Sequence, residues 1–438
     1  MRIRTLLCSA LLLMGARAFA FNQVQENNAT QSENQHYTLS LEQAKQLAIE
    51  YNVTLKNAGL SIEQANAATW EAISQGLPQV SASADYSTFF GASSSLMGNE
   101  IEFNNTSNFN ATASQLIFSG SYIVGLQTAK LYEAMVTKSA EKSQLDVKQQ
   151  VADAYYAILL AEKTKTILEQ NLANVVDLHK KTEQMYKAGV AELTDVDQLS
   201  IQVTMLESSL RTTERQTSLA YDMLKLQIGI SPLASVELSQ TIDDFFMPET
   251  FYASLLKAFN VADNVEYQLV EQQTEITNKQ VKLAKMEYLP TITAAFNHLE
   301  QIIEPNFNMT PKNSLTFNMS IPIFSSGQRK AKVDQAKIDL QMAENNMLQL
   351  NDALLTQDRT IKTNLKTALD QYDAQKKNVD VAKRVFDNIN RKYEAGMVSS
   401  LDLTTANTNY LNAESSYIQA MLDVMQAYIE LERFYNNI

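Results

Sequence analysis

The sequence predicts a mainly α-helical protein that also carries membrane-crossing β-strands. Residues 126–228 and 328–438 contain no proline and one glycine each, Gly189 and Gly396. Because glycine and proline interrupt helices, each stretch is expected to form two helices joined by a single turn. Between the predicted helices, four short segments alternate strictly between apolar and polar residues, as strands with one apolar face do. The same order of elements occurs twice, which indicates an internal repeat.

The first 20 residues predict a signal peptide for export. Arg2 and Arg4 precede an apolar run, and small residues stand at Ala18 and Ala20, a pattern that suits cleavage after Ala20. Residues 21–36 are polar and predict a disordered lead. The only cysteine, Cys8, lies in the apolar run, so the mature chain is expected to have neither disulfides nor thiol chemistry.

The remaining chain divides into two structural repeats, 37–229 and 251–438, joined by a linker at 230–250. Each repeat is expected to run through a helix, a hairpin, a helix of about 67 residues, a tip turn and a returning helix. Sixty-seven helical residues span roughly 100 Å, and the other helices are about half as long, so that two of them end to end match one long helix. The expected elements are helix 39–76, hairpin 79–118, tip turn 186–194 and helix 194–229 in the first repeat, and helix 251–288, hairpin 291–324, tip turn 393–400 and helix 398–434 in the second.

Each of the four predicted strands has about 10 residues, the length that a tilted strand needs to cross a bilayer. No segment after the signal approaches the roughly 18 apolar residues that a membrane-spanning helix requires. Four strands cannot close a barrel, because spanning barrels have at least about eight strands, and an open edge in hydrocarbon leaves backbone groups unpaired. The chain is therefore expected to oligomerise: two copies give eight strands and three give twelve.

Six motifs in this order resemble the TolC family of outer-membrane efflux proteins, over essentially the whole chain from about Tyr37. They are "GLPQVSASADYS" and "YLPTITAAFNHL" before the strands, "LIFSGSYIVGLQTAK" and "IPIFSSGQRKAKVDQAK" after them, and the turns "YKAGVAELTDVDQL" and "YEAGMVSSLDLTTA". The resemblance implies a homotrimer in the outer membrane of a Gram-negative bacterium. Its twelve-stranded β-barrel would continue into a long antiparallel α-helical barrel in the periplasm, with residues 230–250 in an equatorial belt. One departure is Ser325-Ser326-Gly327, where the family often has paired glycines.

The resemblance gives the two tip turns a role at the periplasmic end. It implies that they narrow the entrance and dock the helical hairpin of a periplasmic adaptor protein, through Ala188, Gly189, Val190, Ala395, Gly396 and Met397. The glycines also have a simpler explanation, because a glycine in the left-handed conformation commonly ends a helix.

Carboxylates follow each turn, with Asp195 and Asp402 six residues after the glycines. Asp402 matches a family position that lines the entrance, so three copies would form an acidic ring, to which Asp195 and Asp197 would add charge. Crowded carboxylates favour cations. Helix capping is the alternative, because Ser399-x-x-Asp402 fits a capping box. The resemblance also suggests a closed-state latch from Tyr393 to Asp195, although Val398 stands where the family often has a basic residue.

The function implied is a passive exit duct of a tripartite efflux or type I secretion system. Its partners would be the adaptor, an inner-membrane pump reached through the adaptor, and outer-membrane lipid. A formal charge of −13 offers no basic patch for nucleic acid. No cofactor, metal site or enzyme activity is expected, since the three histidines lack metal-ligand spacing. The alternatives are a trimeric surface adhesin or scaffold with a shared membrane barrel and, less readily, a periplasmic helical binding protein.

Overall fold

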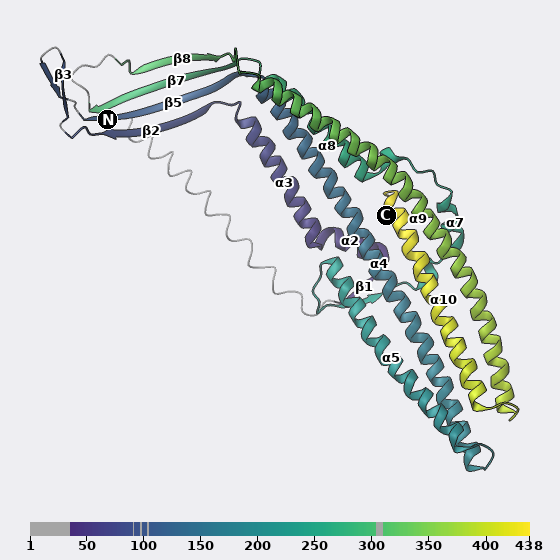
Figure 1. Ribbon diagram of the computed structural model, residues 1–438. Coiled ribbons are helices and arrows are strands. Elements are labelled where there is room, and N and C mark those ends of the chain that lie inside the picture. Colours follow the sequence, from purple (N-terminus) through teal and green to yellow (C-terminus); the bar gives the residue numbers. More distant parts are fainter. Residues whose placement is uncertain (1–35, 91, 97–98, 103–104, 304–309) are drawn as a thin grey trace.

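The computed structural model describes residues 36–438, apart from 91, 97–98, 103–104 and 304–309. The predicted signal peptide, Cys8 and residues 21–35 of the predicted lead lie outside the described residues. Figure 1 shows an elongated molecule with a four-stranded sheet at one end and a long slab of helices leading away from it.

Two long helices run the length of the slab. They are α4 (Gly120–Lys187) and α9 (Gln328–Glu394), of 68 and 67 residues, each roughly 100 Å long. The chain then turns back into α5 (Leu193–Ile228), which packs on α4, and α10 (Ser400–Phe434), which packs on α9. All four helices begin and end within about two residues of the predicted positions, because the absence of glycine and proline leaves nothing else to interrupt them.

The two half-length helices that precede the hairpins are not continuous, which corrects the prediction for 39–76 and 251–288. The first consists of α2 (Leu41–Tyr51) and α3 (Val53–Ser74). The second consists of α7 (Pro248–Leu255), the 3-10 turn η1 (Val261–Asp263) and α8 (Val265–Met286). An extended asparagine, Asn52 or Asn264, separates the parts. Its side chain accepts hydrogen bonds from the first N–H groups of the following helix, as an N-cap does.

The same two asparagines also join the half-length helices end to end. Asn52 Nδ2 donates to the carbonyl of Gln227 at 2.7 Å, and Asn264 Nδ2 donates to the carbonyl of Phe434 at 3.1 Å. These carbonyls belong to the last turns of α5 and α10, whose terminal C=O groups have no partner within the helix. Each asparagine therefore caps one helix and satisfies the end of another, and both are buried.

The four strands that the alternating pattern predicted form one antiparallel sheet, in the order β2-β5-β7-β8. The strands are β2 (Gln79–Ser87), β5 (Thr106–Ser119), β7 (Thr291–Ile303) and β8 (Asn313–Ser320). Their register separates an apolar face from a polar face: one row across the strands is Val80, Ala113, Phe296 and Leu315, and the adjacent row is Ser81, Thr112, Asn297 and Ser314. In the longer first tip, β3 (Ser93–Leu96) pairs with β4 (Asn99–Glu102).

The best-packed part of the molecule lies at the middle of the slab. There β1 (His36–Leu39) pairs in parallel with β6 (Ser235–Leu238), and α6 (Ile242–Phe245) follows. His36, assigned from sequence to the polar lead, is thus the first residue of a strand, and its ring bonds the hydroxyl of Ser235 at 3.2 Å. The core around this belt includes the fully buried side chains of Tyr155, Phe251, Leu365 and Phe434.

Candidate functional site

The two tip turns have the same backbone geometry, which explains their shared sequence. Gly189 and Gly396 adopt left-handed φ angles of 72° and 67°. At the first tip, Gly189 N–H donates to the carbonyl of Tyr186 and Val190 N–H to that of Met185. The second tip repeats both bonds at positions 396 and 397. This pair of bonds is the Schellman motif, which requires the left-handed residue at the glycine position.

All six residues predicted for adaptor docking are exposed on these tips. Val190 and Met397, which follow the glycines, are 70% and 72% exposed. A Cβ added at either glycine would find no atom within 4 Å, so the space beside each turn is open. Each tip therefore offers an apolar side chain beside an uncovered stretch of backbone.

Asp402 caps α10, as the capping-box interpretation predicted. Its Oδ2 accepts from the Ser399 N–H at 3.0 Å and from the Ser399 hydroxyl at 2.7 Å, while the Asp402 N–H donates to that hydroxyl. The hydrogen bond from the Ser399 hydroxyl, and to a lesser extent the bond from the Ser399 N–H, lower the pKa of the Asp402 carboxyl below its usual value. The carboxylate is fully exposed, so capping leaves it accessible to solvent.

Asp195 links the two helical hairpins. Its Oδ2 accepts from the Glu192 N–H at 3.1 Å, which caps α5, and its Oδ1 accepts from the hydroxyl of Ser400 at the start of α10. Ser400 is only 2% exposed and also donates toward Gln198 Oε1. Asp197, the third carboxylate predicted near the entrance, is exposed. The structure thus brings Asp195 against the second hairpin.

The Tyr393 hydroxyl bonds Thr182 rather than Asp195. The two oxygens lie 2.8 Å apart between α9 and α4, and both residues are buried. Burial raises the pKa of the Tyr393 hydroxyl, and the negative charge of Asp195 adds to the shift. The aspartate is therefore near enough to act on the tyrosine electrostatically, but within this chain the expected latch bond is not formed.

Besides the bond from Ser400 to Asp195, two further contacts between the hairpins were not predicted from the sequence. Thr182 interrupts the apolar stripe of α4, which was a visible signal for a buried polar contact. Lys181 Nζ lies 2.9 Å from an oxygen of Asp177 and 3.5 Å from one of Glu394, and so joins α4 to α9. All three side chains are exposed, and charged residues of this kind give no pairing signal in the sequence.

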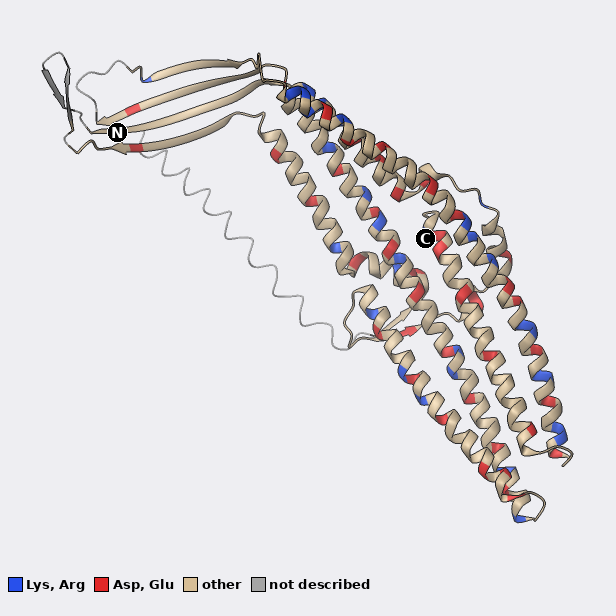
Figure 2. Cartoon of the chain, in the orientation of Figure 1, with Lys and Arg blue, Asp and Glu red and all other residues tan. Residues whose placement is uncertain are grey.

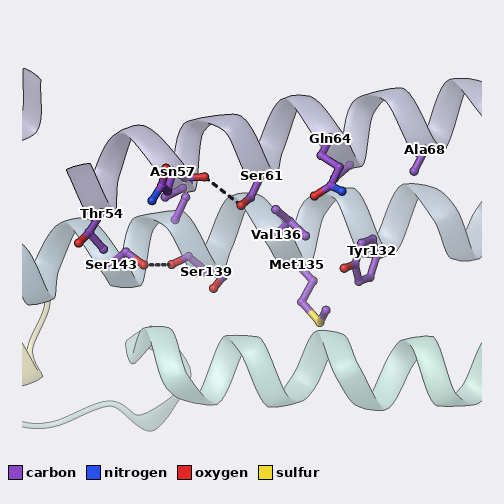
Figure 3. Close-up of a pocket in the computed structure, with 13 residues that line it drawn as sticks. Thr54, Asn57, Ser61, Gln64, Ala68, Tyr132, Met135, Val136, Ser139 and Ser143 are labelled. Carbon is purple, nitrogen blue, oxygen red and sulfur yellow. Dashed lines mark hydrogen bonds between the residues drawn. The ribbon is translucent and has the colours of Figure 1, made fainter. Parts of the chain in front are cut away.

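A groove of about 660 Å³ runs between α3 and α4 (Figure 3). Small side chains form most of its walls: Ala58, Ser61, Ala65 and Ala68 from α3, with Ser139, Ala140 and Ser143 from α4. On the other side of the slab in Figure 1, α9 exposes long apolar side chains, Ile338, Met342 and Leu348, at 56%, 52% and 67%. The slab therefore has a concave wall of small residues and, on another helix, a row of apolar knobs.

Charge is distributed unevenly between the two ends of the molecule. Figure 2 shows charged residues along the helices, while the strands are almost free of them. Among the described residues, no helix combines the length and apolar character needed to cross a bilayer. Within the same part of the chain, no three acidic, histidine or cysteine side chains gather as metal ligands would.

A sheet with one apolar face, joined to a helical slab of roughly 100 Å, defines an outer-membrane protein with a periplasmic helical extension. Comparison with known families gives a match to the outer membrane efflux protein model over residues 44–229 and 264–437. The chain belongs to that family. It is accordingly located in the outer membrane, with its helical part in the periplasm.

Individual relatives are distant in sequence but similar in structure. The chain is 26% identical over 288 residues to the pyoverdine export outer membrane protein OpmQ of Pseudomonas aeruginosa, an alignment that covers 64% of this chain and 59% of OpmQ. It is 22% identical to the outer membrane protein TolC of Vibrio cholerae, across 88% of this chain and 90% of that protein. CusC superposes with a TM-score of 0.76 at 17% identity, covering 90% of this chain and 92% of CusC. The CmeC channel of Campylobacter jejuni gives 0.75 at 18% identity, covering 91% and 85%.

Proposed function

We propose that the protein is the passive exit duct of a tripartite efflux or type I secretion system. The observation that carries the proposal is the membrane-type sheet continued by a helical slab about 100 Å long, in a chain of the outer membrane efflux family. Among the relatives described above, OpmQ is named for pyoverdine export, CmeC is described as an outer membrane channel and CusC is described with transmembrane channel formation, which favours a duct over the adhesin alternative.

The duct is proposed to form from three copies of the chain. Strands β2 and β8 are the edges of the sheet and pair on one side only within the described residues. Joining β8 of one copy to β2 of the next satisfies these edges, and three copies give twelve strands. Two copies would give eight, a barrel that its own side chains nearly fill.

The groove between α3 and α4 supports the same head-to-tail contact. Its lining residues on α3, 54–68, lie about 9–30 Å below the end of that helix, at 1.5 Å per residue. Residues 338–348 of α9 lie about 15–30 Å below the start of α9. Both distances are measured from the sheet, so the exposed apolar side chains of α9 and the groove lie at similar distances below it. The α9 side chains of one copy can therefore pack into the groove of the next copy.

Cysteine pairs test this arrangement directly, because the described residues contain no cysteine. Ser61→Cys combined with Met342→Cys, at about 20 Å and about 21 Å from the sheet, is expected to give disulfide-linked dimers and trimers on a denaturing gel. Trp70→Cys with Val381→Cys, which lie at different heights, is the matched control. A cross-linked ladder from the control pair alone would refute the proposed contact.

The duct's entrance is proposed to lie at the tips, lined by Asp402, with Asp195 and Asp197 nearby. The accessible carboxylate of Asp402 and its lowered pKa support a ring that stays negative at neutral pH. In planar bilayers, Asp402→Asn is expected to reduce the preference for cations, whereas Asp380→Asn, at an exposed position in the last third of α9, leaves it unchanged. Cation selectivity identical to wild type in Asp402→Asn would rule out the ring.

The exposed tips are proposed to dock the adaptor, through which an inner-membrane pump supplies the energy. Val190→Asp with Met397→Asp places charge on the two apolar tip positions and should block docking without closing the pore. We expect ethidium to accumulate in cells that carry the adaptor and the pump, while single-channel conductance of the variant persists. Normal ethidium export by the variant would exclude these residues from docking.

A further inference from the structure

A cluster of cations lies on the helices directly beside the sheet. It comprises Lys282 and Lys285 near the end of α8 and Arg329, Lys330 and Lys332 at the start of α9, and is called the junction cluster below. Figure 2 shows its α9 part as blue ribbon where α9 meets the sheet. The whole chain carries a formal charge of −13, so this concentration of positive charge runs against the overall composition.

Two members of the junction cluster hold the local structure together. Arg329 is only 7% exposed, donates from Nη1 to the carbonyl of Pro322 at 2.6 Å, and lies over the ring of Tyr288. Lys332 Nζ pairs with Glu287 at 2.8 Å. These contacts hold the start of α9 against the end of α8, so the two helix ends that carry the other lysines of the cluster are fixed relative to each other.

The other three members have no such role. Lys282, Lys285 and Lys330 are exposed, and none makes a side-chain hydrogen bond or ion pair with the residues described around it. Three unpaired ammonium groups within a few turns repel one another unless an anion lies between them. Their placement therefore suits an anionic partner outside the chain.

Exposed apolar side chains adjoin the cluster on the side of the sheet. Ile323 and Phe324 lie between β8 and α9 and are 92% and 85% exposed. Leaving two such side chains in water forgoes the favourable free energy of burying their apolar surface. Burial in the acyl region of a membrane would recover that free energy.

The dimensions of the sheet place this junction at a membrane boundary. At the opposite end of the strands, Lys312 pairs with Glu300 at 3.0 Å, nine residues along β7 from Thr291. Nine residues at about 3.3 Å give roughly 30 Å along the strand, or about 23 Å along the membrane normal for a tilt near 40°. This matches the apolar band of about 25 Å in outer-membrane barrels, so the charged pair and the junction cluster stand at its two ends.

We infer that Lys282, Lys285 and Lys330 bind the phosphate groups of anionic phospholipids in the periplasmic leaflet of the outer membrane. Ile323 and Phe324 insert among the first acyl carbons of the same lipids. The inference rests on the membrane-crossing sheet of the proposed duct. Lysine suits this role because it binds phosphate as a compact charge on a flexible stem, and basic residues beside a membrane attract anionic lipid.

The test compares lipid affinities of the purified full-length protein by native mass spectrometry, with phosphatidylglycerol and phosphatidylcholine as probes. The triple variant Lys282→Gln, Lys285→Gln, Lys330→Gln should bind phosphatidylglycerol at least tenfold more weakly, with binding of phosphatidylcholine unchanged. The matched control, Lys366→Gln, Lys377→Gln, Lys383→Gln, removes three exposed lysines lower on α9 and should bind both lipids as wild type does.

The outcomes separate this site from the duct itself. Equal affinity of the wild type for both lipids, or undiminished phosphatidylglycerol affinity in the triple variant, would overturn the lipid site. A change in the ion selectivity of the triple variant without a change in its lipid affinity would also overturn the lipid site, because the lysines would then face the pore. Conductance by the triple variant leaves the duct standing in each case, whereas a wild type without conductance refutes the duct.

Discussion

Gly229 allows a quantitative test of how the half-length helices stack. It ends α5 with a left-handed φ of 83°, and a Cβ at this position would lie 2.5 Å from the carbonyl oxygen of Tyr51 and 2.6 Å from its carbon. Gly396 has a similar φ of 67°, but an added Cβ there meets nothing within 4 Å. The two glycines thus share a backbone conformation and differ in what surrounds them.

The expected cost of alanine follows from that difference. At Gly396 only the left-handed conformation opposes alanine, which costs roughly 1–2 kcal/mol. At Gly229 the backbone must also move away from Tyr51, which breaks the bond from Asn52 to the Gln227 carbonyl and leaves a buried polar group unpaired for about 1–3 kcal/mol more. Gly229→Ala should therefore lose about 2–5 kcal/mol of unfolding free energy.

Thermal unfolding in detergent, followed by circular dichroism at the helical band, would measure both variants. We expect a clearly lower midpoint for Gly229→Ala than for Gly396→Ala, with the same helical signal in both before unfolding. Equal midpoints would refute the end-to-end contact, because conformational strain alone would then account for both.

Three further predictions concern single polar groups. Asn264→Ala should lower the unfolding midpoint, because it removes the N-cap of α8 and leaves the carbonyl at the end of α10 unpaired, at a cost of about 1–3 kcal/mol. A midpoint equal to that of the wild type would contradict the inference that Asn264 stabilises both helix ends. Burial first, and then the negative charge of Glu430, raise the pKa of Asp153 to about 6, so the folded state loses stability as the pH rises from the unfolded value near 4 to about 6, and no such loss remains below pH 4. Asp153→Asn should raise the unfolding midpoint at pH 8 by an amount corresponding to about 1–2 kcal/mol, after discounting for solvent screening, and should not raise it at pH 4. Asp339→Asn, at an exposed site, is the control for the change in net charge. An equal gain by Asp153→Asn at both pH values would exclude desolvation as the cause. Tyr393→Phe removes the bond to Thr182 and should destabilise the tip by about 1 kcal/mol; hydrogen exchange of α9 near the tip would detect this, and unaltered protection would show that the bond contributes nothing.

The long helices and the four strands could be predicted because each depends on local pattern alone. Beyond Gly125, helix α4 continues to the turn at Gly189, and α9 continues to the turn at Gly396, while strand alternation determines which side chains share a face. The breaks at Asn52 and Asn264 could not be predicted in this way. An asparagine inside a helical pattern does not by itself mark a break, and here the side-chain amide is also held by the end of a helix about 170 residues away.

The helices α5 and α10 end in the same backbone geometry, but the residue in the left-handed conformation differs between them. Asn436 ends α10 with a left-handed φ of 58°, in the place that Gly229 takes after α5, and it makes the same pair of backbone bonds. The positions of the glycines therefore indicate the end of α5 but not the end of α10. Asparagine tolerates the left-handed conformation through its short polar side chain, which here donates to the carbonyl of Asp263.

At the tips, the sequence predicted the cap formed by Asp402 but not the contacts of Asp195. A capping box is local, so its residue spacing is sufficient to identify it. The bond from Ser400 to Asp195 joins positions 205 residues apart and depends on how two helical hairpins pack. The same holds for Tyr393, whose partner Thr182 lies on a different helix.

The geometry of these two aspartates also shows that capping and pore lining do not exclude each other. Both bonds that Asp402 accepts from Ser399 end on Oδ2, so Oδ1 carries neither of them, and the cap holds the carboxylate ionised in a fixed direction. Asp195 instead uses one oxygen for the cap of α5 and the other for Ser400. A cation at the entrance would meet a free oxygen at Asp402 and would have to displace a hydrogen bond at Asp195. If the tips line a pore, Asp402 should therefore dominate its selectivity, and Asp195 should act mainly by holding the two hairpins together.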